Sequence, residues 1–326
     1  MEDYRIPVTI ITGFLGAGKT TLLNQLIKRY PQKKFAIIEN EFGEIGIDGS
    51  LIVGVNENIF ELNNGCICCS LNSDFYRTID QLMDSEYVFN HLLIETTGIA
   101  DPLSIINAFF DGGGIQDQFK IDSVIGVADA VNIEDLIDEH AEIRKQISVS
   151  DTLLINKSDS VDPKYLKTLT QMIGEINPLA NIIPTSFCDC KDIPLLDTDA
   201  YNAKHVEQST LNFSLHPHHH DHNHEISTIA FEFPGVFDFS KFSLWIENYM
   251  FFNSHKILRI KGILAFEDYS ERFIFHSVVN SFLLEPGKKW DEELPFSKLI
   301  FIGKHLDRDE INEGLTQLRV MELRDN

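Results

Sequence analysis

Short apolar runs alternate with segments of helical spacing along the first two thirds of the chain. The runs predict buried strands, and the segments between them predict helices, most clearly Pro163–Ile176. This alternation favours a mainly parallel sheet covered by helices on both faces, an α/β fold. The strands are expected at residues 6–11, 34–39, 92–98, 124–128, 152–155 and 181–184. Two further runs, Leu51–Val55 and Ile59–Leu62, predict a small hairpin.

The last hundred residues follow a different pattern. Strands are expected at 226–233, 257–266, 272–279 and 299–303, with helices at 239–252 and from Asp307. The resulting order, β-α-β-β-β-α, predicts a small α+β domain close to a ferredoxin-like sandwich. Between the two patterns lies His216–His224, a histidine-rich tract with too little apolar content to join a core, which predicts a linker. We therefore expect domains at 1–212 and 226–326, joined by 213–225.

Charge and composition narrow the classes of partner. The 50 acidic residues outnumber the 27 basic ones, for a net charge of −23, which argues against a nucleic-acid or anionic-membrane surface. No apolar stretch is long enough to span a bilayer, and the charged N-terminus does not resemble a secretory signal. Five cysteines, crowded into two short segments, suit metal or redox chemistry in a reducing cytoplasm better than a disulfide framework.

One glycine-rich segment, GFLGAGKT at Gly13–Thr20, fits the pattern G-x-x-x-x-G-K-[ST] between a predicted strand and a predicted helix. Glycines allow the backbone to wrap a phosphate, and the helix N-terminus adds partial positive charge. Lys19 can reach the β- and γ-phosphates, and the Thr20 hydroxyl can ligate Mg²⁺. The sequence therefore predicts a P-loop NTPase, with a phosphate site formed by Gly13, Gly16, Ala17, Gly18, Lys19, Thr20 and Thr21.

A second polar segment, N-K-x-D at Asn156–Asp159, follows the strand expected at 152–155. The Asp159 carboxylate can accept two hydrogen bonds from guanine, whereas adenine presents the opposite pattern and would leave the carboxylate unpaired. Lys157 can lay its stem on the base, and Asn156 can tie this segment to the glycine loop. The pair of segments favours GTP over ATP.

Acidic residues end two of the expected strands. Glu95 and Gly98 fit an acid-x-x-Gly pattern in which the acid holds Mg²⁺ and the glycine N–H meets the γ-phosphate. Glu39, Glu41 and Asp48 lie in or beside the loop after the second strand. One of them can position the attacking water or bind metal, although three acids in one loop are equally a solvated surface. The catalytic candidates are Lys19, Glu39 and Glu95.

Three thiols in four residues, at Cys66, Cys68 and Cys69, can converge on one soft metal ion such as Zn²⁺ or Cu⁺. A fourth ligand must come from elsewhere, for example from Glu41, Asp48, a histidine, water or a partner protein. The alternative, three inert buried cysteines, fits poorly because almost no aliphatic residues accompany them. The histidine tract can also bind metal weakly, or be only a linker, and Cys188 and Cys190 are interpreted as structural or incidental.

These motifs together resemble the CobW-like GTPases, a family of the SIMIBI class of P-loop GTPases. The resemblance rests on GFLGAGKT, ENEFG at Glu39–Gly43, C-x-C-C, ETTG at Glu95–Gly98 and N-K-x-D, and on Trp290 before the last strand, which is similar to the CobW C-terminal domain. It implies that the phosphate-loop residues, Glu95 and the N-K-x-D residues handle Mg²⁺ and GTP. It also implies that Cys66, Cys68 and Cys69 bind a metal for delivery.

We therefore expect a cytoplasmic, GTP-hydrolysing metallochaperone that binds Zn²⁺ and passes it to a client metalloprotein. One alternative keeps the GTPase and changes the cargo to Co²⁺, for cobalamin or hydratase assembly. Another is a zinc-buffering or zinc-sensing protein that GTP regulates, with the histidine tract as its reservoir.

Overall fold

The computed structural model describes residues 3–39, 59–63, 73–110, 114–213, 226–278 and 281–320. The chain groups into two compact units. The first comprises Met1–Gly174 with Ala180–Ala200, and the second comprises Glu175–Leu179 with Tyr201–Asn326.

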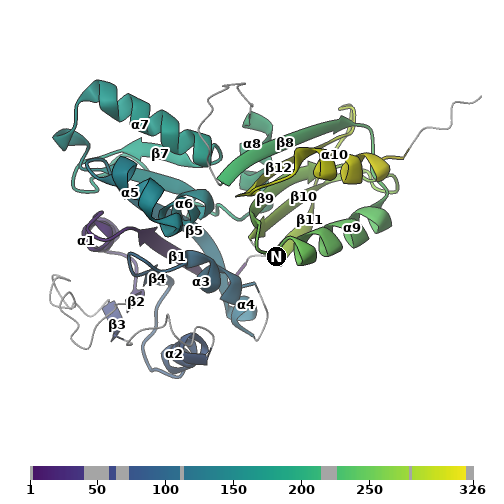
Figure 1. Ribbon diagram of the computed structural model, residues 1–326. Coiled ribbons are helices and arrows are strands. Elements are labelled where there is room, and N and C mark those ends of the chain that lie inside the picture. Colours follow the sequence, from purple (N-terminus) through teal and green to yellow (C-terminus); the bar gives the residue numbers. More distant parts are fainter. Residues whose placement is uncertain are drawn as a thin grey trace, which may run out of the picture. The chain divides into compact units, whose positions relative to one another are not determined.

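A seven-stranded sheet of order β3-β2-β4-β1-β5-β6-β7 forms the centre of the first unit (Figure 1). All of its strand pairs are parallel, as the alternation of apolar runs and helices predicted. Its central strands are almost wholly buried, which is why they appear in the sequence as continuous apolar runs. The strands are β1 (Ile6–Gly13), β2 (Phe35–Glu39), β3 (Ile59–Asn63), β4 (His91–Glu95), β5 (Phe119–Asp129), β6 (Thr152–Asn156) and β7 (Asn181–Pro184).

Helices cover both faces of this sheet. On one face, Leu22, Leu23 and Leu26 of α1 pack against alternate residues of the central strands. On the other face, Ile143 and Ile147 of α6 line a small cavity with β5. The helices of this unit are α1 (Lys19–Arg29), α2 (Ser73–Met83), α3 (Pro102–Ala108), α4 (Ile115–Gln118), α5 (Ile133–Glu139), α6 (Ala141–Val149) and α7 (Pro163–Ile176, with its last two residues in the second unit), with a 3₁₀ helix at Ser158–Ser160.

The hairpin expected at residues 51–62 is corrected in part. Strand β3 forms, but its partner is β2, to which it is parallel. A short apolar run can mark a strand without specifying which neighbour it pairs with, because pairing depends on packing elsewhere in the sheet. The first half of the expected hairpin, Leu51–Val55, lies outside the described residues.

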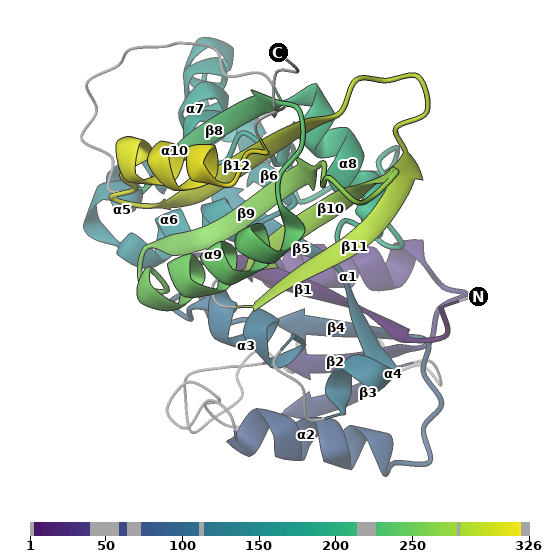
Figure 2. The ribbon, with the colours of Figure 1, turned by 90° about the vertical axis from the view of Figure 1, so that its right-hand side faces the viewer.

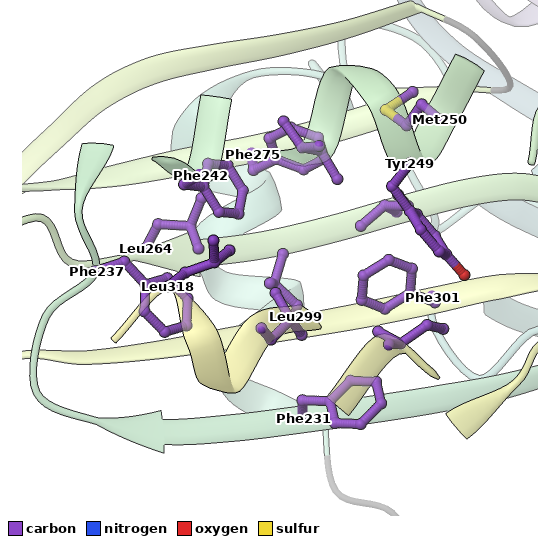
Figure 3. Packing of buried hydrophobic residues seen from close by; sticks show 14 of the residues in the cluster. Phe231, Phe237, Phe242, Tyr249, Met250, Leu264, Phe275, Leu299, Phe301 and Leu318 are labelled. Atoms are coloured by element: carbon purple, nitrogen blue, oxygen red, sulfur yellow. The ribbon is translucent and has the colours of Figure 1, made fainter. Parts of the chain in front are cut away.

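The second unit contains a five-stranded antiparallel sheet of order β11-β10-β9-β12-β8. Its strands are β8 (Ile226–Pro234), β9 (Ile257–Leu264), β10 (Glu271–Val278), β11 (Ser281–Lys289) and β12 (Phe296–Lys304). Helices α9 (Phe239–Phe252) and α10 (Arg308–Gln317) cover one face and enclose an aromatic core that includes Phe242, Phe275 and Phe301 (Figures 2 and 3). Helix α8 (Ala203–Asn212) packs on the opposite face, where Val206 contacts Ile263 and Trp290.

This topology confirms the expected α+β domain and adds one strand to it. Strands β8 and β9 flank β12 and are connected through α9, which is the split β-α-β arrangement of ferredoxin-like sheets. Strand β11 was not predicted, because Pro286 and Gly287 interrupt its apolar pattern.

The border between the units also differs from the expected position at residue 212. Because α8 lies against the second sheet, the division falls after Ala200. No helix within the described ranges is long and apolar enough to cross a membrane.

Candidate functional site

The carboxyl ends of five parallel strands meet along one edge of the first sheet. Gly13 ends β1, Glu39 ends β2, Glu95 ends β4, Asp129 ends β5 and Asn156 ends β6. In register, Glu39 lies opposite Glu95, and Asp129 lies opposite Asn156. Ligands of open parallel sheets bind at this edge, so the topology gathers the predicted residues where a ligand would be expected.

The glycine segment turns from β1 into α1. Gly18 caps the helix with φ 114°, a left-handed conformation that favours glycine. A Cβ atom added there would lie only 2.4 Å from Asn156 Nδ2, so the position also requires the absence of a side chain. No acidic residue lies in the first turn of α1, so nothing within that turn offsets the partial positive charge of the helix N-terminus. The loop is thus built to receive an anion.

Two side chains from the first turn of α1 lie at this loop. The Lys19 ammonium group is 3.3 Å from the carbonyl oxygen of Phe14, and the residue is only 8% exposed. The Thr20 hydroxyl donates to Glu95 Oε1 at 3.1 Å, and Glu39 is buried on the neighbouring strand. Hydroxyl and carboxylate oxygens are the hard ligands that Mg²⁺ prefers, so Thr20 and Glu95 fit that ion chemically.

Asn156 connects three segments of the site. Its Nδ2 donates to the carbonyl oxygen of Ala17 at 2.9 Å, and its Oδ1 accepts from the backbone N–H of Cys188 at 3.0 Å. The Cys188 thiol lies 3.4 Å from the carbonyl oxygen of Gly18, as a weak donor. Burial, with a smaller contribution from Cys190, raises the pKa of the Cys188 thiol to about 12. The thiol therefore stays protonated and keeps the hydrogen that it donates to the Gly18 carbonyl oxygen.

This link through Cys188 is a part of the site that sequence analysis missed. The cysteine pair carries no motif, and only the return of the chain after β7 brings it beside the glycine loop. Of the two interpretations offered, structural or incidental, the contacts of Cys188 favour the structural one, but its position next to Gly18 was not anticipated.

Lys157 lies beside a second residue that was not predicted, Asp129. The Lys157 ammonium is 2.7 Å from Asp129 Oδ2, and the lysine backbone adopts a left-handed φ of 59°. Burial tends to raise the pKa of Asp129, but the hydrogen bonds from Lys157, Val131 and Asn132 outweigh it, so that this pKa is lowered. Asp129 is therefore ionised and holds the lysine side chain over the strand ends.

The remaining predicted residues of the described chain lie around this centre. Asp159 is exposed, and its backbone N–H donates to Ser186 Oγ at 3.2 Å. Gly98 lies against the glycine loop, since an added Cβ would be 2.5 Å from the backbone nitrogen of Leu15. Its carbonyl accepts from Gln146 Nε2 at 3.0 Å. Gly16 has a left-handed φ of 73° within the loop, and Thr21 is exposed on α1.

The predicted metal ligands Glu41, Cys66, Cys68 and Cys69 lie outside the described residues, as does the histidine tract. Among the residues that the structure does describe, no group of three or more histidine, cysteine, aspartate or glutamate side chains could hold a metal ion.

A parallel sheet with a phosphate-binding loop after its first strand, and an N-K-x-D segment tied to that loop, defines a P-loop GTPase. Residues 7–184 match the family model of the CobW/HypB/UreG nucleotide-binding domain. Residues 226–319 match the cobalamin synthesis protein cobW C-terminal domain. The chain belongs to this family, and the predicted resemblance is confirmed.

Known relatives span nearly the whole chain. The zinc chaperone YjiA of Escherichia coli is 32% identical over 96% of this chain and 99% of its own length. The zinc-regulated GTPase metalloprotein activator 1 of Schizosaccharomyces pombe is 32% identical over 93% of this chain and 83% of its own length. Among solved structures, the Zn(II)-bound YjiA GTPase of E. coli superimposes with a TM-score of 0.75 at 28% identity, covering 98% of this chain and all of that one.

Proposed function

We propose that this chain hydrolyses GTP and couples the nucleotide state to the binding and delivery of Zn²⁺ to a client protein. The zinc ion is cargo, held by Cys66, Cys68 and Cys69 with an additional ligand such as Glu41. The names of the YjiA and activator relatives, which refer to zinc, support this choice of cargo. Co²⁺ is the alternative cargo, and its affinity can be titrated in parallel with that of Zn²⁺.

The observation that carries the proposal is the parallel register of β3, β2 and β4. Asn63 lies opposite Glu39, which lies opposite Glu95, so the three residues share the edge at which the glycine loop lies. Neighbouring strands are about 4.8 Å apart. Cys66 follows Asn63 by three residues, so the covalent chain keeps it within roughly 21 Å of Glu95. The C-x-C-C motif therefore begins three residues after a strand that shares this edge.

We assign each residue of the site a role that its position supports. Lys19 and the helix N-terminus bind the phosphates, and Asp159 accepts the two N–H groups of guanine while Lys157 covers the base. Thr20 and Glu95 would hold Mg²⁺, which when bound neutralises charge that develops on the phosphates. Glu39, buried beside Glu95, would orient the attacking water.

An assay of phosphate release tests the proposed hydrolysis of GTP. Glu95→Gln should reduce the rate of GTP hydrolysis by about a hundredfold, because it weakens the metal ligand. Glu39→Gln should also reduce the rate while leaving the Kd for GDP nearly unchanged. Glu86→Gln, an exposed residue after α2, serves as the matched control. Equal rates for all three variants would contradict these assignments.

Metal titration tests whether the nucleotide state is coupled to the affinity for Zn²⁺. Zn²⁺ is titrated into protein that holds GDP or a non-hydrolysable GTP analogue, and Co²⁺ is titrated in parallel. We expect the Zn²⁺ affinity to differ between the two nucleotides, and by thermodynamic reciprocity Zn²⁺ must shift the affinity for the nucleotide by the same factor. Replacing Cys66, Cys68 and Cys69 by serine should abolish both effects.

The control for this experiment is Cys190→Ser, which changes another thiol of the same chain. Equal Zn²⁺ affinity in both nucleotide states would contradict coupling, and tighter binding of Co²⁺ than Zn²⁺ would favour cobalt as cargo. Several weakly bound ions that are lost when residues 216–224 are deleted would instead indicate a zinc-buffering protein.

A further inference from the structure

A second cavity lies in the second unit, among residues that the GTPase chemistry does not use. It has a volume of about 340 Å³ and lies between α8, β10 and the end of β11. Its lining is mostly charged: Lys204, Glu207, Gln208, Leu211, Arg272, Lys288, Lys289, Asp291 and Glu293.

Arg272 lines this cavity and is 95% buried. Its Nη1 bonds Glu207 and its Nη2 bonds Glu293, each at 2.9 Å, and its guanidinium stacks 4.5 Å from the Trp290 ring centroid. The guanidinium is thus already neutralised by two carboxylates, which connect it to α8 on one side of the cavity and to the segment after β11 on the other.

Four basic and three acidic side chains line the cavity, so its charge is positive by one, in contrast to the acidic chain as a whole. Glu207 and Glu293 are engaged by Arg272. Within the described residues, no ion pair forms at the ammonium groups of Lys204, Lys288 or Lys289, and Asp291 is the remaining acid of the lining. In a chain of net charge −23, three unpaired lysines around one cavity form a local site for anions.

The surroundings favour a polypeptide over a small free anion. Strand β11 is an edge of its sheet and pairs only with β10 in the part of the chain described. An extended peptide can therefore continue from the cavity along this edge and use its backbone hydrogen bonds. The three lysines stand on two separate segments, α8 and β11, which suits several carboxylates spaced along a chain.

We propose that this cavity binds an acidic, extended segment of a partner protein, with carboxylates at Lys204, Lys288 and Lys289. The inference does not depend on the nucleotide or metal chemistry of the first unit. It assigns the second unit a docking function of its own.

Fluorescence polarisation with the full chain tests this proposal. The probe is a short labelled peptide that alternates glutamate and threonine, and its control replaces every glutamate by glutamine. We expect only the acidic peptide to bind, more tightly at low than at physiological salt. The double variant Lys288→Gln/Lys289→Gln should weaken binding by about tenfold, as the loss of two exposed ion pairs predicts.

The matched control is Lys164→Gln/Lys167→Gln on α7, which removes the same charge from another exposed surface and should leave binding unchanged. Lys204→Gln is a second variant on α8, for the case in which the double variant does not fold. Absence of peptide binding, or equal weakening by both double variants, would overturn the proposal. Displacement of the peptide by an equal concentration of free glutarate, or tighter binding of polyuridine at the same lysines, would overturn the assignment to a polypeptide.

Discussion

The side-chain amide of Asn156 donates to the backbone carbonyl of Ala17 across 2.9 Å, which joins the loop after β6 to the phosphate loop after β1. The same amide accepts from Cys188 N, so one buried residue connects the loops that follow three strands. The base and the phosphates of one bound nucleotide would contact different loops. The connection through Asn156 therefore fixes the distance between the loop that would bind the base and the loop that would bind the phosphates.

Asn156→Ala should therefore weaken the binding of guanine nucleotides and destabilise the first unit. The substitution leaves the Ala17 carbonyl and the Cys188 N–H without their partner, which costs about 1–3 kcal/mol. Isothermal titration with GDP and chemical denaturation measure the two effects. Asn90→Ala removes a hydrogen bond to Lys34 N at the opposite end of the strands and should leave the Kd for GDP unchanged. Equal GDP affinities for both variants would contradict a role for Asn156 in spacing the loops.

The Lys157–Asp129 pair predicts a defined dependence of stability on pH. The pKa of Asp129 is lowered in the folded state, so the pair stabilises fully above the unfolded pKa of about 3.9 and is lost as the pH falls through the folded value. Because Lys157 is partly exposed, we expect Asp129→Asn to cost only about 1 kcal/mol near pH 7. The difference from wild type in the free energy of unfolding should begin to narrow as the pH falls below about 4. Asp80→Asn on α2 is the exposed control.

His91, the first residue of β4, belongs to a buried network of polar side chains at the end of the sheet away from the glycine loop. Its Nε2 is 2.9 Å from Thr9 Oγ1, and that hydroxyl donates to Asp122 Oδ2 at 3.3 Å, so Nε2 must carry the proton. The Lys33 ammonium lies 3.4 Å from Nδ1. Burial and Lys33 lower the pKa of His91 to about 3. We expect nitrogen NMR shifts to show a neutral, Nε2-protonated ring down to about pH 5, and a charged ring there would contradict this arrangement.

The same residue should make the protein less stable in mild acid. Between about pH 6.5 and pH 3 the unfolded state binds a proton at His91 that the folded state does not, so the free energy of unfolding falls as the pH falls. Asp122 opposes this in part, because burial raises its pKa to about 6. His91→Gln should therefore lose less stability than wild type between about pH 7 and pH 5 in denaturation experiments. His255→Gln, an exposed histidine, should behave as wild type.

Removing Arg272 should destabilise the second unit strongly. Its partner Glu207 is buried, with a side chain only 8% exposed, and Arg272→Ala would leave that carboxylate without its cation. Breaking a buried pair in this way costs about 3–5 kcal/mol. Both tryptophans, Trp245 and Trp290, belong to this unit, so their fluorescence follows its unfolding in denaturant. Arg5→Ala breaks an exposed pair with Asp3 and should cost less than about 1 kcal/mol.

Most of the elements of the fold were predictable from local patterns. Buried parallel strands form unbroken apolar runs, and α7 and α9 have the bounds that their spacing predicted. The pairing of β3 and the existence of β11 were not predictable, because both depend on neighbours that are distant in the sequence. The border after Ala200 likewise depends on which sheet α8 covers.

The residues of the candidate site likewise fall into those that local patterns predicted and those that they did not. Lys19, Thr20, Glu95 and Asn156 were predicted because phosphate and guanine recognition require particular residue types at fixed spacing. Cys188 was interpreted only as structural or incidental and Asp129 was not singled out, because each acts through a contact with a residue far along the chain.

The sequence by itself determined the class of the protein, because the glycine loop and N-K-x-D each act through residues that lie within a few positions of one another. Only the tertiary structure decided that Asn156 joins the two loops, that Glu39 and Glu95 stand side by side, and that unpaired lysines surround Arg272 in the second unit. These relationships arise from strand order and helix packing, which the whole chain determines and no single segment encodes.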